Sequence, residues 1–474
     1  MSAGAAGWWR SDRGERVAVA VGLGWVALVG AVVAVVSGSL GHDEAQYALG
    51  ARGLVDGAAD ADPYPLHRSI GMRLLAAPGV VAGGSELAIR LPFVLVAMVY
   101  AALVWRLARR AGAASGLLAL AVQVTAAPWL MRSGEALSDL PAAALVLAMV
   151  VLMTDDAARP RPRVGAWLGA AVAGAAAIYL RYGSGPLVAL VLATVMVVYR
   201  RRRVATFLTG VGVALLLVPF FLWSEARTGS LLGVLQVSEL AANRAYVGDG
   251  LVWYATRWPW AVAGPLMGAV AAVGVAVGIS AWRPGRATAA DAEAASARLR
   301  RVLVVSALGQ IILLGLRAHG EARYVFFATT ALTVAGAGWI AIRPRLRAAV
   351  LVLSAISAVG GAAVAISRSD RMAWRRVALV GAAAAVRVDA DGQRCLVFTG
   401  TRPQISWYTG CRTELVGGEP VVAETATGFD RVYLLSADRA PWQPRDGAAL
   451  SAPGLTFRPW RCGEAPTWCV WRAR

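Results

Sequence analysis

Eleven apolar runs, each long enough to form a membrane helix, alternate with polar segments along most of the 474-residue chain. Because a span needs about 20 mainly apolar residues, this pattern predicts an α-helical polytopic membrane protein. The first run follows Arg10, Arg13 and Arg16 as in a signal peptide, but it can span a bilayer and no small-residue cleavage site follows, so we expect a retained helix. The runs are 17–36, 90–108, 113–131, 140–154, 164–180, 186–199, 204–223, 260–281, 302–316, 324–342 and 348–367.

Composition supports this class, since 58% of the residues are hydrophobic and 16% are charged. The net charge of +19 would suit nucleic acid, but the cations lie in alternate loops between the runs, as the positive-inside rule requires, and we expect no nucleic-acid partner. The loops that we therefore place in the cytoplasm contain Arg106, Arg109, Arg110, Arg159, Arg161, Arg163, Arg200 to Arg203, Arg283, Arg286, Arg298, Arg300, Arg301, Arg343, Arg345 and Arg347.

An odd number of spans places the C-terminal tail outside the cell, in the plasma-membrane topology that we predict. We expect a transmembrane domain over 1–367 and a small extracytoplasmic α/β domain over 368–474. In this tail "RMAWRRVALVGAAAAVRV" predicts an amphipathic helix, and "RCLVFTG" and "RVYLLSA" predict short buried strands.

All four cysteines lie in the tail, namely Cys395, Cys411, Cys462 and Cys469. Cysteines confined to the side predicted to be oxidising indicate disulfides, and pairing each with its neighbour in sequence is the simplest of three possible arrangements. The alternative is four reduced thiols in an ordinary fold.

Two carboxylates, Asp43 and Glu44, follow the first apolar run almost directly, at the start of a helix predicted over 43–55. They could simply cap the helix, because negative charge is favoured at a helix N-terminus by about 0.3–1 kcal/mol. Ionisable groups close to a bilayer are costly, however, and usually functional. We therefore treat this pair as candidate catalytic residues.

A second acidic motif, "RSGEALSDLPAAALVL", places Glu135 and Asp139 at the same predicted outer face. Asp139 stands just before Pro141 at a helix start, and for Glu135 a capping role is the better interpretation. Two acidic sites on one face could bind a hydroxylated acceptor, with Asp139 and Tyr47 as its contacts.

Cations share that face, since "YLRYGSGP" contains Arg181 and the short turn in "GLRAHGEARYVFF" contains Arg317, His319 and Arg323. One arginine at a membrane boundary could merely extend its charge to the interface. Three arginines and a histidine together indicate an anionic, phosphorylated ligand.

Three stretches carry a family resemblance: "HDEAQYALGARGLV", "SELAIRLPFVLVAMVYAALVWRLARR" and "EALSDLPAAALVLAMVVL". They resemble the GT-C glycosyltransferases, in the protein O-mannosyltransferase and aminoarabinose-transferase branch (glycosyltransferase family 39-like), over the first 200 residues. The matching motifs are Asp43-Glu44, Arg90-Leu91-Pro92 and Asp139-Leu140-Pro141.

The resemblance implies an inverting transferase that takes a sugar from a polyprenyl phosphate at the extracytoplasmic side. Asp43 would be the general base, with Glu44 as the alternative, and Arg181, Arg317, His319 and Arg323 would bind the donor phosphate. No cofactor is required, although a divalent cation could bind Asp43 and Asp139. The absence of Lys indicates a GC-rich bacterium such as an actinomycete, where mannose or arabinose donors are expected. The acceptor would be an envelope glycan, lipid or protein.

Two other classes remain open. A transporter or flippase of lipid-linked sugars would show inverted repeats and broken spans, and neither is clear in this chain. A non-catalytic envelope-assembly protein would instead bind a partner through the tail, for which "TRPQISWYTGC" is a candidate surface.

Overall fold

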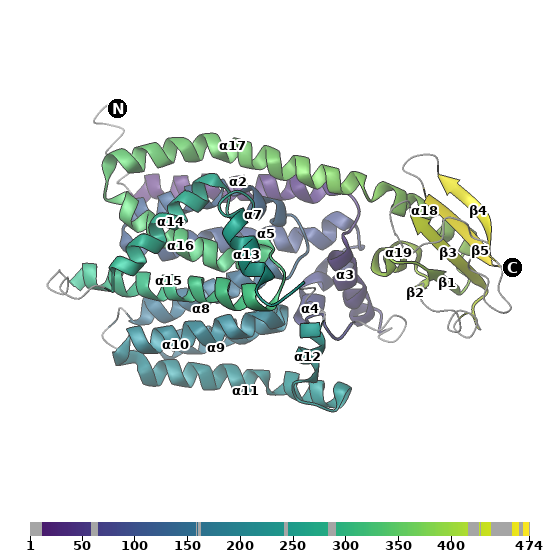
Figure 1. Cartoon of the computed structure of the whole chain (residues 1–474), viewed down its shortest axis with the longest axis horizontal. Coiled ribbons are helices and arrows are strands. Elements are labelled where there is room, and N and C mark those ends of the chain that lie inside the picture. The colour runs from purple at the N-terminus through teal and green to yellow at the C-terminus, as the bar shows by residue number, and fades with distance from the viewer. Residues whose placement is uncertain are drawn as a thin grey trace. The chain divides into compact units, whose positions relative to one another are not determined.

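The chain forms two compact units in a computed structural model (Figure 1). The helical unit comprises Met1–Val33, Pro65–Met72 and Leu91–Ile366, and the mixed unit comprises Ala34–Tyr64, Arg73–Arg90 and Ser367–Arg474. The mixed unit therefore combines the predicted tail domain with two segments from the first fifth of the chain. The structure describes residues 12–57, 65–157, 159, 163–240, 245–282, 291–415, 426, 428–437, 457–463 and 468–473.

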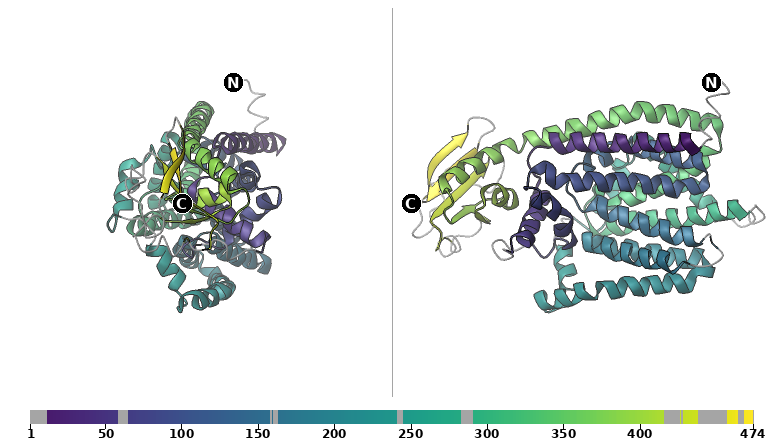
Figure 2. Two further views of the ribbon diagram at one scale, coloured as in Figure 1. Left: turned by 90° about the vertical axis from the view of Figure 1, so that its right-hand side faces the viewer. Right: turned by 180° about the vertical axis from the view of Figure 1, so that it is seen from behind.

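Long apolar helices that run roughly parallel to one another make up the helical unit (Figures 1 and 2). Short helices and 3₁₀ turns connect them. In chain order the elements are α2 (Asp12–Val36), α5 (Glu86–Ala108), η1 (Arg109–Ala111), α6 (Ala113–Gln123), α7 (Ala127–Arg132), α8 (Asp139–Ala157), α9 (Val164–Leu180), η2 (Tyr182–Ser184), α10 (Gly185–Val198), η3 (Arg200–Arg202), α11 (Arg203–Thr228), α12 (Gly233–Leu240), α13 (Asp249–Arg257), α14 (Pro265–Ser280), α15 (Asp291–Arg317), η4 (Ala322–Val325), α16 (Phe326–Ala341) and α17 (Pro344–Trp374).

The predicted fold class is confirmed. Seven helices among the described residues are long and apolar enough to cross a membrane, and each covers one of the predicted runs. The other four runs are represented by shorter apolar helices, α6, α9, α10 and α14. The sequence did not predict α12 or α13, which are short and lack a long apolar run.

One predicted span, 113–131, is wrong as a continuous helix, because it is two helices separated at 124–126. The Thr125 hydroxyl donates to the Val122 carbonyl at 2.8 Å within this break. Pro128 is the second residue of α7, in its first turn, where the missing N–H of proline costs no helical hydrogen bond.

Helix α16 is buried over most of its length, and it packs against α14 at very close range. A Cβ atom at Gly274 would lie 2.0 Å from the Leu332 carbonyl oxygen, and one at Gly336 would lie 2.1 Å from the Val270 carbonyl oxygen. Only glycine permits this approach of the two backbones.

By contrast, α11 exposes a long apolar face, as expected of a helix against lipid. The exposed side chains are Val204, Phe207, Leu208, Val211, Leu215, Leu216, Val218 and Leu222.

In the part of the chain that the structure describes, the mixed unit contains four helices, the ends of α2, α5 and α17, and a five-stranded sheet. Its helices are α3 (His42–Val55), α4 (Gly71–Val81, whose first two residues belong to the helical unit), α18 (Val377–Ala390) and α19 (Arg402–Thr409). Its strands are β1 (Cys395–Phe398), β2 (Arg412–Glu414), β3 (Arg431–Ala437), β4 (Phe457–Gly463) and β5 (Trp468–Ala473). The helix predicted in the tail is divided, since its first four residues end α17 and most of the remainder forms α18. The two predicted strands appear as β1 and β3, whereas α4, α19 and the other strands were not predicted.

The sheet has the strand order β2-β1-β3-β5-β4, with β1 parallel to both its neighbours and β5 antiparallel to β3 and β4. Helices α18 and α19 bury apolar side chains against one face of it, where Val386 and Ile405 join the same cluster as Tyr433 of β3. A separate apolar cluster that includes Phe398 and Phe457 covers part of the other face.

A disulfide joins Cys395 in β1 to Cys411, two residues beyond the end of α19. Cys469 is also disulfide-bonded, and it lies opposite Cys462 in the register of β4 and β5. The side chain of Cys462 lies outside the described residues, so the second pairing stays a prediction.

Candidate active site

The predicted site residues fall into two groups, one in each unit. Asp43, Glu44 and Tyr47 lie in the mixed unit. The helical unit contains Asp139 and the predicted cations Arg181, Arg317, His319 and Arg323.

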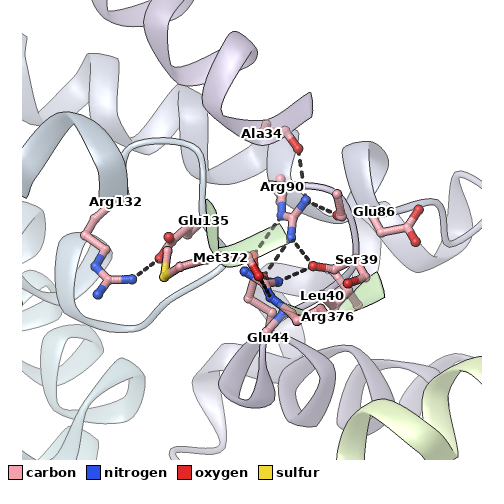
Figure 3. Close-up of polar contacts among 12 residues, drawn as sticks. Ala34, Ser39, Leu40, Glu44, Glu86, Arg90, Arg132, Glu135, Met372 and Arg376 are labelled. Carbon is pink, nitrogen blue, oxygen red and sulfur yellow. Dashed lines mark hydrogen bonds and ion pairs between the residues drawn. The ribbon is translucent and has the colours of Figure 1, made fainter. Parts of the chain in front are cut away.

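Glu44 occupies the third position of α3 and is 3% exposed. Its Oε2 accepts the backbone N–H of Gly41 at 2.7 Å, so its side chain caps its own helix. Arg90 binds the same carboxylate with two parallel hydrogen bonds, from Nε to Oε1 and from Nη2 to Oε2, both 2.8 Å long (Figure 3). Glu44 is therefore fully engaged in holding the start of α3.

Arg90 is fully buried, yet each part of its guanidinium has an oxygen partner. Besides Glu44, its Nη1 donates to the carbonyls of Ala34 at 2.9 Å and Gly38 at 2.6 Å, and its Nη2 donates to Ser39 at 3.0 Å. A buried charge is tolerated only when it is paired and hydrogen-bonded in this way. The pair thus fixes the turn between α2 and α3.

Asp43 has a different environment from its neighbour. It is the second residue of α3 and partly exposed, whereas Glu44 is buried. A general base must reach a substrate proton, which a carboxylate enclosed by an arginine cannot do. Of the two candidates, only Asp43 combines a carboxylate with access.

Tyr47 is 3% exposed and packs within the unit. Its predicted contact with an acceptor remains a prediction, and this burial favours a packing role.

In the helical unit, three charged side chains from three different elements converge. Asp139 is the first residue of α8, where the helix N-terminus favours its negative charge. Arg181 follows the last residue of α9 and forms an ion pair with Asp139. Arg323, in η4, places its Nε 3.6 Å from Asp139 Oδ2.

Tyr324 and Gln310 organise this cluster. The Arg181 guanidinium lies 4.4 Å from the centre of the Tyr324 ring, and that of Arg323 lies 5.4 Å from it. Gln310, within α15, donates to the Tyr324 carbonyl and accepts the Ala328 N–H, both at 2.9 Å. It thereby satisfies backbone groups where η4 passes into α16 and holds the turn that carries Arg323.

These residues line a pocket with a charged part and an apolar part. Two arginines and one carboxylate contribute formal charges of +2 and −1, so the lining is cationic. The remainder of the lining is mainly apolar. The lining residues are Asp139, Ala142, Ala143, Val146, Arg181, Gly183, Ser184, Leu187, Gln310, Leu314, Arg323 and Tyr324.

His319 and Arg317 do not line this pocket. His319 Nε2 lies 3.5 Å from Glu321 Oε1, and Glu321 forms an ion pair with Arg323. The histidine is therefore connected to the pocket residue Arg323 through Glu321. Arg317 is exposed at the end of α15. Glu135 forms an ion pair with Arg132, three residues earlier, so its observed role is not the predicted cap.

Among the residues that the structure describes, no group of three or more His, Cys, Asp or Glu side chains could hold a metal ion. A cation shared by Asp43 and Asp139, which belong to different units, stays a prediction.

Sequence reasoning missed the roles of Arg90, Gln310 and Tyr324. Arg90 was noted in the Arg-Leu-Pro motif, and a charged residue entering an apolar run was the signal that it needs a buried partner. Gln310 gave a similar signal inside an apolar helix. Nothing in the spacing of Tyr324 distinguishes it from an ordinary interfacial aromatic.

The helical bundle, the small sheet domain and the cationic pocket together define a polytopic membrane protein with the GT-C glycosyltransferase fold, as the resemblance predicted. Residues 74–223 match the family described as dolichyl-phosphate-mannose-protein mannosyltransferase. No curated protein matches this sequence.

Several solved structures share the fold. ArnT from Cupriavidus metallidurans bound to undecaprenyl phosphate matches with a TM-score of 0.68 at 15% identity, covering 98% of each chain. The Archaeoglobus fulgidus oligosaccharyltransferase AglB, in complex with an inhibitory peptide and a dolichol-phosphate, matches with a TM-score of 0.58 at 12% identity, covering 87% of this chain and 69% of its own. The same A. fulgidus protein in complex with Zn and sulfate matches with a TM-score of 0.55 at 12% identity, covering 87% and 68%.

Proposed function

We propose that this protein is a membrane glycosyltransferase that moves a sugar from a polyprenyl-phosphate donor to the hydroxyl group of an extracytoplasmic acceptor. The observation that carries the proposal is the pocket where Arg181, Arg323 and Asp139 converge beside an apolar lining. A lipid phosphate has this dual character, with an anionic head next to a hydrocarbon chain. The shared fold with proteins solved with undecaprenyl phosphate and dolichol-phosphate supports the same donor class.

Asp43 is the general base in this proposal. It removes the proton of the acceptor hydroxyl as that oxygen attacks the anomeric carbon, and the bond from this carbon to the phosphate oxygen breaks. The products are the glycosylated acceptor, with inverted configuration, and the polyprenyl phosphate. Glu44 does not take this proton, because Arg90 encloses its carboxylate.

Arg181 and Arg323 stabilise the negative charge that the phosphate gains as it leaves. A phosphate is already a good leaving group, so fixed positive charge suffices and no general acid is needed. Asp139 orients the two guanidinium groups through its ion pairs with them. This assignment is narrower than the sequence expectation, since it leaves out Arg317 and His319.

The sugar is mannose or an arabinose-like pentose in this proposal, and the acceptor is a glycan, lipid or protein of the cell envelope. The protein lies in the plasma membrane with its tail domain outside the cell. No step requires a bound cofactor.

Replacing Arg181 or Arg323 by Gln is expected to raise the KM for the lipid donor by about 10- to 100-fold, because a hydrogen bond to a charged group contributes about 1.5–3 kcal/mol. Transfer of labelled sugar from a synthetic polyprenyl-phosphate sugar measures this effect. Arg257→Gln is the matched control, since Arg257 is exposed at the end of α13 and absent from the pocket lining. Unchanged donor KM in both pocket variants would refute the phosphate assignment.

The same assay separates the main alternative class. A flippase moves its lipid-linked sugar across the bilayer and forms no glycosylated acceptor. If the purified protein forms no glycosylated product with any envelope acceptor but moves the lipid-linked sugar across vesicle membranes, a flippase function replaces the proposed transferase.

The proposed orientation has its own test. A cysteine introduced at Arg201 should react with a membrane-impermeant maleimide only after the cells are permeabilised, and one introduced at Val388 should react in intact cells. Both positions are exposed, so access to the thiol is decided by the membrane alone. Labelling with the opposite pattern would reverse the topology and remove an extracytoplasmic reaction.

A further inference from the structure

We propose that Tyr408, in the tail domain, is a positioning residue that holds the segment carrying Asp43 in its reactive placement. The inference rests on the proposed function, since it gives the tail domain a task in the same reaction. Four observations within the mixed unit support it.

First, side chains bind four backbone polar groups of the turn 38–41, which leads into α3: the Gly38 and Ser39 carbonyls and the Leu40 and Gly41 N–H groups. Arg90 binds the carbonyls of Gly38 and Ser39, and Glu44 accepts the Gly41 N–H. These bonds from four separate side chains restrict the turn to one placement. Asp43 follows it directly, so its position is set by this turn.

Second, the tail domain supplies two of these partners. Arg376, at the start of α18, donates through Nη1 to the Ser39 carbonyl, and this Nη1 lies 4.0 Å from Glu44 Oε2 (Figure 3). The Tyr408 hydroxyl, in α19, accepts the backbone N–H of Leu40 at 2.7 Å. Residues more than 300 positions apart thus share one short turn.

Third, the Tyr408 hydroxyl accepts one hydrogen bond and donates another. It accepts from Leu40 and donates its own proton to Glu86 Oε1 at 3.0 Å. Only the protonated phenol can do both. A tyrosine is already protonated at neutral pH, and burial raises the pKa of Tyr408 further.

Fourth, α19 also contacts the far end of α3. The Arg52 guanidinium lies 3.8 Å from the centre of the Trp407 ring, and its Nη2 is 3.5 Å from the Trp407 carbonyl oxygen. The disulfide between Cys395 and Cys411 ties the chain just after α19 to β1. Helix α19 therefore contacts both ends of α3: Tyr408 binds the turn that precedes α3, and Trp407 contacts Arg52 in its last turn.

The consequence for catalysis is geometric. A base works only within hydrogen-bond reach of the proton that it removes. A displacement of about 1 Å caused far from the chemistry can lower the rate by about 100-fold. The tail domain, although distant in sequence from Asp43, would then set turnover without touching either substrate.

The test compares Tyr408→Phe with Tyr433→Phe in the full-length protein. Tyr433 is a matched control, because its hydroxyl also donates to a carboxylate, Asp389 Oδ2 at 2.6 Å, whereas none of its recorded hydrogen bonds reaches the turn. Hydrogen–deuterium exchange of the resting protein, without substrate, reports the Leu40 amide directly. We expect faster exchange over 38–44 in Tyr408→Phe only, together with a 10- to 100-fold lower kcat and an unchanged donor KM.

Unchanged exchange over 38–44, or faster exchange with a normal kcat, would overturn the inference. A second variant, Arg52→Met, covers the case in which Tyr408→Phe does not fold. It keeps the aliphatic stem of Arg52 but removes the guanidinium contact with Trp407. We expect faster exchange over 38–44, a lower kcat and an unchanged donor KM here too. The exchange measurement does not depend on sugar transfer. A failure of the proposed function, shown by an active Asp43→Asn, is therefore distinct from a failure of this inference.

Discussion

Asp43→Asn is expected to lower turnover by about two to four orders of magnitude while the protein remains folded and binds its lipid donor. Asparagine has the shape of aspartate and keeps one carbonyl oxygen as a hydrogen-bond acceptor, but its amide does not accept a proton. The change also removes a negative charge from the second position of α3, which costs only about 0.3–1 kcal/mol. A large loss of kcat with a nearly normal melting temperature is therefore the signature of a general base.

The helix-cap interpretation predicts a different outcome. Asparagine and aspartate serve about equally well as caps, so a merely structural Asp43 would leave transfer of labelled sugar close to that of the wild type. Such a result would withdraw Asp43 from the mechanism. Glu44→Gln completes the comparison. Because Glu44 is buried and paired with Arg90, this change should lower the melting temperature, and any loss of turnover should follow from the loss of stability.

Arg90→Met is expected to produce the largest loss of stability, about 3–5 kcal/mol, because it removes the arginine that binds both oxygens of the buried Glu44 carboxylate and leaves only Arg376, 4.0 Å away, as counter-charge. It also removes a donor to the Ala34 carbonyl in α2 and to the Gly38 and Ser39 carbonyls of the turn. The melting temperature in detergent, followed by tryptophan fluorescence, measures the effect.

Two further variants make this result specific. The double variant Arg90→Met with Glu44→Gln should be more stable than Arg90→Met alone, since no unpaired charge remains. Arg106→Met is the surface control: its partner is Asp155, the side chains are 53% and 32% exposed, and such pairs contribute about 0–1 kcal/mol. Equal melting temperatures for Arg90→Met and Arg106→Met would contradict the assigned role of the buried pair.

The membrane helices could be predicted from the sequence because a bilayer demands long apolar runs and leaves little choice of structure. The run 164–180 coincides with α9. Prediction failed where this rule does not apply. The break between α6 and α7 depends on local bonding at Thr125 inside an apolar run, and α12, α13 and α19 are too short to give a periodic signal.

The candidate site was predictable in its residue types but not in its pairings. Asp43 and Glu44 are adjacent acids, and only the fold reveals that Arg90, 46 positions away, binds one of them. Arg181 follows α9 and Arg323 lies in η4, so their distances from Asp139 depend on tertiary packing. The four predicted cations therefore divided into two that line the pocket and two that do not.

The close contact of α14 with α16 has a consequence for how this sequence can change over evolutionary time. At Gly274 and Gly336 any side chain would collide with the opposite backbone, so those sites accept a single residue type. The apolar face of α11 requires only that its side chains be hydrophobic, and many exchanges satisfy it. The shape of such a bundle depends on a few close backbone contacts and elsewhere only on hydrophobic composition. Its sequence can therefore diverge widely while the fold is kept, as the common architecture with ArnT at 15% identity illustrates.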